Sequence, residues 1–283
     1  MEEAGRLRNR AAIVVGADTI GCGIAQALAQ AGASVALLDV GPDAAAKGAC
    51  RLRTTGQHCL EARFSASGES SLESVLSDTA SCLKSLEILV VNLLPRAHPA
   101  PLVNLSADAL ARSAAAISHS VVAMQAALPW LRSAGCGRII NVGHRYGDGI
   151  NGEMGAYNAA AWALWGLTRT AALEWGQYQI TSNLLMPFAD TPELRAAQHH
   201  RPELMERLLR QVPLQRAGDP VQDIGGAAVF LAADEAAFVN GEILYADGGQ
   251  HVAGPVLNPA KFPAATLFEH PGRTRRARPD RAA

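Results

Sequence analysis

The stretch Arg138–Trp175, RIINVGHRYGDGINGEMGAYNAAAWALWGLTRTAALEW, decides the fold of this chain. Its first five residues are rich in Ile and Val, which predicts a short interior strand. The glycines that follow predict a loop. From Ala159 onward the stretch is rich in Ala, Leu and Trp and carries only Arg169 and Glu174 as charges. We therefore expect a long helix that is buried on most sides, partly against a second subunit.

Strands and helices alternate along the rest of the chain. The amino-terminal part reads as a strand over Ala11–Gly16, a helix over Ile24–Ala31 and a strand over Ser34–Asp39. Further strands are predicted over 59–64, 87–92, 180–186 and 242–247, and helices over 41–57, 72–86, 106–130, 202–210 and 223–232. This order predicts an α/β fold with one doubly wound, mostly parallel sheet of about seven strands. Tyr157 should lie in the first turn of its helix.

Composition and charge limit the function classes. The net charge of −1 argues against a general nucleic-acid binder, although the last thirteen residues carry five arginines. Neither a charged-then-apolar leader nor an apolar run of membrane-spanning length stands out, so we expect a cytoplasmic protein that does not bind membranes. The five cysteines lack metal-ligand or disulfide spacing, and no metal site is predicted. We expect a single domain over residues 8–250 and an arginine-rich extension over 251–283.

The first strand, turn and helix predict dinucleotide binding. Gly16 and Gly21 would let the backbone approach a pyrophosphate at the amino-terminal end of the helix, and Asp39 would bind the ribose hydroxyls. An acid at position 39 favours NAD over NADP, because it repels a 2′-phosphate. Asp18, however, puts a carboxylate where the pyrophosphate should lie. A turn kept only for close packing is an equally good interpretation.

The stretch around Tyr157 resembles the catalytic segment of the short-chain dehydrogenase/reductase family. In that family a serine after the strand, a tyrosine, and a lysine four residues later form the site. Here only the tyrosine is present: His144 stands at the serine's position and Ala161 at the lysine's. The position of the family's asparagine, which holds a water in its proton relay, is Ala116.

The resemblance covers residues 8–250 and is almost unbroken from 212 to 249, a module that forms subunit contacts in the family. The turn after Val15 lacks the family's threonine and is one residue short. Leu93 and Leu94 replace an Ala-Gly pair that lets the cofactor pass close to the backbone. The resemblance implies cofactor contacts at Gly16, Gly21, Asp39, Asn92, Pro187 and Thr191, and a substrate-lid helix over 202–210.

The substitutions bear directly on proton transfer. In the family, the lysine and the charged cofactor lower the pKa of the tyrosine so that its phenol exchanges a proton with the substrate. A free phenol is only about a thousandth ionised at neutral pH, and matching it to that pH takes about 4 kcal/mol. Ala161 supplies none of this energy. Tyr157 and His144 are therefore the catalytic candidates, with His144 as hydrogen-bond partner or base.

Three functions remain open. The first is that of an NAD-dependent alcohol dehydrogenase or ketone reductase with substitute catalytic groups and weak cofactor binding. Alternatively, the chain is a silent subunit that pairs with an active relative, or it performs redox-neutral dehydration, isomerisation or cyclisation. The uncharged helices ending near Trp130 and Trp175 predict a homo-oligomer or hetero-oligomer. The apolar residues Leu93, Phe188 and Trp162 suggest a hydrophobic or thioester-linked small molecule.

Overall fold

The computed structural model describes residues 5–40, 59–65, 71–93, 95, 100–143, 153–200 and 202–252. His144, Leu94, the predicted helix at 41–57 and the extension from residue 253 onward lie outside these residues.

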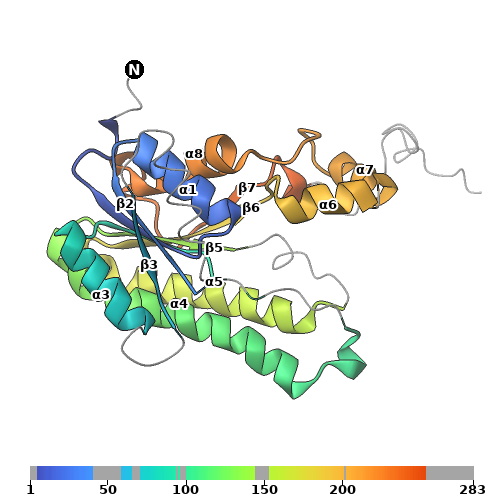
Figure 1. Cartoon of the computed structure of the whole chain (residues 1–283), viewed down its shortest axis with the longest axis horizontal. Helices are drawn as coiled ribbons and strands as arrows, with labels where there is room; N and C mark the ends of the chain where they lie inside the picture. Colours follow the sequence, from blue (N-terminus) through green and yellow to red (C-terminus); the bar gives the residue numbers. More distant parts are fainter. Residues whose placement is uncertain are drawn as a thin grey trace, which may run out of the picture.

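Seven parallel strands form one sheet in the order β3-β2-β1-β4-β5-β6-β7 (Figure 1). This confirms the predicted doubly wound α/β fold. The strands are β1 Ala11–Val15, β2 Ser34–Asp39, β3 Cys59–Arg63, β4 Ile88–Val91, β5 Arg138–Val142, β6 Thr181–Pro187 and β7 Ile243–Ala246. The α-helices are α1 Thr19–Gln30, α3 Leu72–Leu83, α4 Ala107–Ala134, α5 Gly155–Trp175, α6 Pro192–His200, α7 Pro202–Arg210 and α8 Gly226–Ala232. Short helical turns are η2 Leu102–Asn104, η4 Gly176–Tyr178, η5 Pro220–Gly225, η6 Asp234–Ala236 and η7 Gln250–Val252.

Helices cover both faces of the sheet. Helices α1 and α8 lie on one face, and α3, α4 and α5 lie on the other (Figure 1). Alternate residues of β1 enter the two cores: Ala12 and Val14 pack toward α1, whereas Ile13 and Val15 pack toward α3 and α4. Because both faces are buried, the interior strands read as continuous apolar runs rather than alternating ones.

Element boundaries differ from the prediction where side chains cap a helix. Helix α1 begins at Thr19 rather than Ile24, because the Asp18 side chain caps it. Helix α4 begins after the predicted cap, Ser106, but continues to Ala134 with Pro129 inside it. The last predicted helix is divided into a π-helical turn, η5, and α8. Helix α6 was not predicted, because its sequence is polar and short.

Helix α4 is long and apolar enough to cross a bilayer by length and composition, which corrects the expectation that no such run exists. In this fold it packs beside α3 and α5, and its buried residues include Ala123, Met124, Ala127 and Leu131. One apolar stripe against a sheet is the ordinary pattern of a core helix. A cytoplasmic location stays a prediction.

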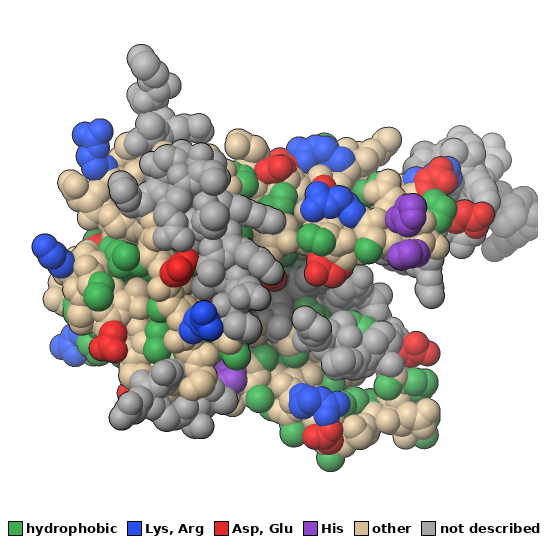
Figure 2. Space-filling view, in the orientation of Figure 1, with side chains coloured by type: hydrophobic (Ala, Val, Ile, Leu, Met, Phe, Trp, Pro, Cys, Tyr) green, Lys and Arg blue, Asp and Glu red, His purple; other side chains and the backbone are tan. Residues whose placement is uncertain are grey.

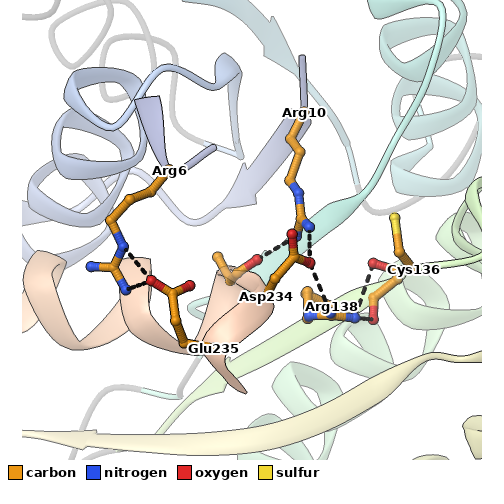
Figure 3. Close-up of polar contacts among 8 residues, drawn as sticks. Arg6, Arg10, Cys136, Arg138, Asp234 and Glu235 are labelled. Atoms are coloured by element: carbon orange, nitrogen blue, oxygen red, sulfur yellow. Dashed lines mark hydrogen bonds and ion pairs between the residues drawn. The ribbon is translucent and has the colours of Figure 1, made fainter. Parts of the chain in front are cut away.

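A group of charged side chains joins residues 6–10, β5 and η6 at the edge of the sheet where the strands begin (Figure 3). Arg10 and Arg138 both contact the Asp234 carboxylate, Arg138 at 3.7 Å. The buried Arg138 guanidinium also donates to the carbonyls of Cys136 and Gly137, each at 3.0 Å. Burial, and then the neighbouring Arg10, lower the pKa of Arg138. This edge is opposite the carboxyl ends of the strands.

Candidate functional site

Three of the six predicted cofactor residues lie at the carboxyl ends of β1, β2 and β4. Gly16 follows β1, Asp39 ends β2 and Asn92 follows β4. Strand order reverses between β1 and β4, and in open α/β sheets ligands bind at such a switch point. Gly16, Asp39 and Asn92 therefore lie at the edge of the sheet where such folds bind ligands, and their contact with a cofactor stays a prediction.

The turn between β1 and α1 is as tight as its glycines suggest. Gly16 has φ +99°, and a Cβ atom there would lie 2.1 Å from the carbonyl oxygen of Asn92. A Cβ atom at Gly21 would lie 1.9 Å from the carbonyl oxygen of Gly16. Only glycine fits either position, because both neighbours are backbone atoms. The turn thus brings the first helix close to β4.

The backbone amides at the start of α1 donate hydrogen bonds to a carboxylate. The Oδ1 atom of Asp18 accepts hydrogen bonds from the backbone N–H groups of Ile20 and Gly21, both at 2.9 Å. It also accepts one from Nδ2 of Asn92 at 2.8 Å. These helix amides are the groups that bind phosphate in dinucleotide-binding folds. The sequence pattern identified Asp18 as an obstacle to a pyrophosphate but did not predict its hydrogen bond with Asn92.

The environment of Asp18 shifts its titration. Asp18 is exposed by its accessible surface, yet neighbouring protein atoms crowd its carboxylate group. This loss of solvent raises the pKa of Asp18, and the hydrogen bonds from Gly21, Asn92 and Ile20 only partly offset it. Glu193 adds a small upward contribution to the same pKa. The turn therefore holds a partly desolvated negative charge.

Asp39 also contacts the turn. Its Oδ2 atom accepts a hydrogen bond from the Ala17 backbone N–H at 2.7 Å. The acid predicted to bind ribose thus has one oxygen committed to the protein. Its role toward a ribose stays a prediction.

Tyr157 is the third residue of α5, as predicted, and its side chain is only 5% exposed. It packs with Met154 and with Ala161, one helical turn further along. A hydrogen bond from Asn141 Nδ2 to Thr168 Oγ1, 2.9 Å long, connects α5 to β5. The helix is therefore fixed against the sheet, with an alanine methyl group where the family has an amine. His144, the other predicted catalyst, lies outside the described residues.

Pro187 and Thr191 lie at the end of β6. Pro187 is the last residue of the strand, and the Thr191 hydroxyl accepts a hydrogen bond from the Leu194 N–H at 3.3 Å, at the start of α6. Phe188 is buried, and its backbone bonds to Ala246 and Gly218. These contacts are structural, and a cofactor role for Pro187 and Thr191 stays a prediction.

A cavity of about 400 Å³ lies between α5 and strands β6 and β7. Ala161, Trp162 and Trp165 line it from α5. Trp162 was predicted to line an apolar site, whereas Leu93 and Phe188 are not among the residues around this cavity. Tyr245 and His251 also line it and were missed by the sequence reasoning. The signal that could have found them is a Tyr-x-Asp-x-x-x-His spacing at the end of the last strand.

Comparison with known proteins agrees with this architecture. A family model described as enoyl-(acyl carrier protein) reductase matches residues 15–251. The cis-4-hydroxycyclohexanecarboxylate dehydrogenase of Sinomonas cyclohexanicum is 33% identical over 85% of this chain and 96% of its own. The 3-oxoacyl (acyl-carrier-protein) reductase of Agrobacterium tumefaciens, solved with NADP bound, has a TM-score of 0.77 and 29% identity, covering 87% of this chain and 96% of that one.

A second solved structure, the gluconate 5-dehydrogenase of Burkholderia cenocepacia in complex with NADP and tartrate, has a TM-score of 0.79 and 27% identity. It covers 88% of this chain and 98% of that chain. Since the match extends over nearly the whole described fold, in sequence as well as in structure, the chain belongs to the short-chain dehydrogenase/reductase family of oxidoreductases.

Proposed function

We propose that this chain is a member of the family with little or no hydride-transfer activity of its own, and that it acts as a subunit of an assembly with an active relative. The observation that carries the proposal is the Asp18 carboxylate, which accepts three hydrogen bonds at the start of α1. A pyrophosphate would have to break these bonds and approach a like charge. Hydrogen bonds to charged groups contribute about 1.5–3 kcal/mol each, so the competition is severe.

The missing lysine supports the same conclusion. Ala161 cannot bond ribose hydroxyls and adds no positive charge beside Tyr157. A phenol with the ordinary pKa of about 10 is protonated at neutral pH unless such a charge is present. NAD binding is therefore weak, and the Asp39 carboxylate makes NADP binding weaker still. These residues do not fit a tightly held dinucleotide.

The outer face of α4 and α5 offers a surface for assembly. Exposed small residues cover it, with exposed Leu110 and Leu173 at its two ends. Figure 2 shows hydrophobic side chains gathered at the end of the molecule where α4 begins. The small residues are Ala111, Ala114, Ala115, Ala159, Ala163 and Gly166. An exposed Arg112–Asp108 pair lies at the start of α4, and the small residues of this face suit close packing against another helix pair.

The test uses a relative from the same organism that keeps the serine, tyrosine and lysine. The two chains should co-elute, and light scattering should give a dimer or tetramer. Gly166→Arg, at a site where a Cβ atom meets open space, should keep the fold but separate the chains. Gly226→Arg, equally open but on α8 across the sheet, is the matched control and should leave assembly intact. Tyr157→Phe should leave the activity of the complex unchanged.

The second candidate is an NAD-dependent alcohol dehydrogenase or ketone reductase using Tyr157 and His144. The position of Tyr157 in the first turn of α5 favours it, as do the dehydrogenases among the relatives. This candidate predicts NADH turnover by the chain alone, lost in both Tyr157→Phe and His144→Ala. Such a loss would refute the subunit proposal. Turnover of substrate without a change in NADH absorbance would instead indicate redox-neutral chemistry.

A further inference from the structure

We propose that the cavity between α5, β6 and β7 binds a small, mainly apolar alcohol, which it recognises through a His251–Asp247 pair. This site is separate from the turn at β1 and β4. The inference does not rest on the proposed assembly role, because binding here needs neither cofactor nor partner.

The cavity has the walls of a small-molecule site. The rings of Trp162 and Trp165 meet edge to face with centroids 4.8 Å apart, and Leu184 and Met186 of β6 complete the apolar lining. The guanidinium of Arg169 lies over the Trp165 ring, 5.4 Å from its centroid, and helps to fix it. A volume of about 400 Å³ is within the usual range for ligand pockets, which is roughly 300–1,000 Å³.

Ala161 contributes to the space. Its short side chain lines the cavity next to the two indole rings. A longer side chain at this position would extend from the wall into the volume that a ligand needs. The substitution that removes the family's amine therefore also opens this cavity.

A rigid polar pair lies at the β7 side. The Asp247 side chain is 3% exposed and accepts hydrogen bonds from the backbone N–H groups of Gly249 and His251, at 3.0 and 2.7 Å. His251 Nδ1 lies 3.0 Å from both carboxylate oxygens. The Tyr245 ring stacks on the imidazole at 3.9 Å with an interplanar angle of 12°. Two contacts thus fix the orientation of the imidazole.

The pair determines what the cavity recognises. An ionised carboxylate only accepts hydrogen bonds, so Nδ1 of His251 donates to it. In the neutral imidazole, Nε2 is then an acceptor, and its natural partner is a hydroxyl group. No lysine or arginine is among the described residues that line the cavity, which disfavours phosphates and carboxylates. Two indole rings favour a ring compound.

The experiment is a tryptophan fluorescence titration of the full chain without cofactor. The ligand is cyclohexanol, and the control ligand is cyclohexyl methyl ether, which has the same ring but no hydrogen-bond donor. Cyclohexanol should give a saturable change, and the ether should bind roughly five- to tenfold more weakly, the usual effect of one hydrogen bond. Trp162→Phe should reduce the signal, which assigns it to this cavity rather than to Trp130 or Trp175.

Two variants separate the polar and apolar parts. His251→Phe keeps a ring to stack on Tyr245 but lacks nitrogen, so it should bind both compounds with equal affinity. Ala161→Leu should weaken both by filling the cavity. If His251→Phe disturbs the fold in circular dichroism, His251→Gln, which keeps a polar side chain, replaces it and should retain part of the preference. Equal binding of alcohol and ether to the unchanged chain, or the absence of saturation, would overturn the proposal.

Discussion

The Asp18 side chain stabilises the fold, but its surroundings disfavour its ionised form. Its Oδ1 atom caps α1 and binds Asn92, yet partial desolvation raises its pKa. All three hydrogen bonds use the same oxygen, so an asparagine side chain could accept them equally. Asp18→Asn is therefore a clean way to remove the charge while keeping the cap.

The sign of the effect on stability follows from the raised pKa. In the unfolded chain an aspartate has a pKa of about 3.9, and the pKa of Asp18 in the folded chain is higher. The stability that Asp18 contributes is complete below the unfolded value and is lost as pH rises through the folded value. The melting temperature of Asp18→Asn should therefore rise relative to the original chain as the pH increases from about 4 upward. Thermal melts across this range check it, and a constant difference would contradict it.

At the scale of elements, the crossing of α1 and η5 depends on glycine. A Cβ atom at Gly23 would lie 2.4 Å from the Pro220 carbonyl oxygen, and one at Gly225 would lie 2.4 Å from the Ala27 Cβ. The backbones can approach only because both side chains are absent. This contact places α1, and with it the turn that holds Asp18, against the carboxyl-terminal module.

Gly23→Ala should destabilise the protein by about 1–3 kcal/mol, the usual cost of overpacking a close contact. Gly226→Ala is the control, because a Cβ atom there meets open space and alanine favours a helix by about 1 kcal/mol over glycine. Urea unfolding of both variants measures the difference. If Gly23→Ala were as stable as Gly226→Ala, the crossing would not be as tight as described.

Sequence periodicity was sufficient to predict most helices and strands, but it was insufficient to predict the residues of the candidate site. The strands β2 and β5 have the predicted bounds, because they are apolar runs ended by polar or glycine residues. The start of α1 was misplaced, because its first turn depends on a side-chain cap rather than on apolar spacing. The His251–Asp247 pair was missed for a similar reason. Its chemistry depends on a turn that brings two residues four apart into contact, and not on a family motif.

At the scale of the whole molecule, Asp234 connects the amino-terminal segment, β5 and the turn after α8 (Figure 3). Asp234→Ala should destabilise the fold by about 1–2 kcal/mol, because it leaves the buried Arg138 without its counter-charge. The exposure of Asp234 to solvent limits the effect. Glu235→Ala, which breaks only the pair with Arg6, should cost less than about 0.5 kcal/mol. Chemical unfolding would compare the two, and equal losses would contradict this account.

We propose that Asp18 and Ala161 leave this chain with weak dinucleotide binding. Isothermal titration calorimetry of the full chain with NAD tests it most directly. We expect a dissociation constant in the millimolar range for the original chain. Asp18→Asn, which keeps the turn but removes the like charge, should bind at least about fivefold more tightly, since even a screened charge pair is worth about 1 kcal/mol. A micromolar or tighter dissociation constant for the original chain would contradict the account.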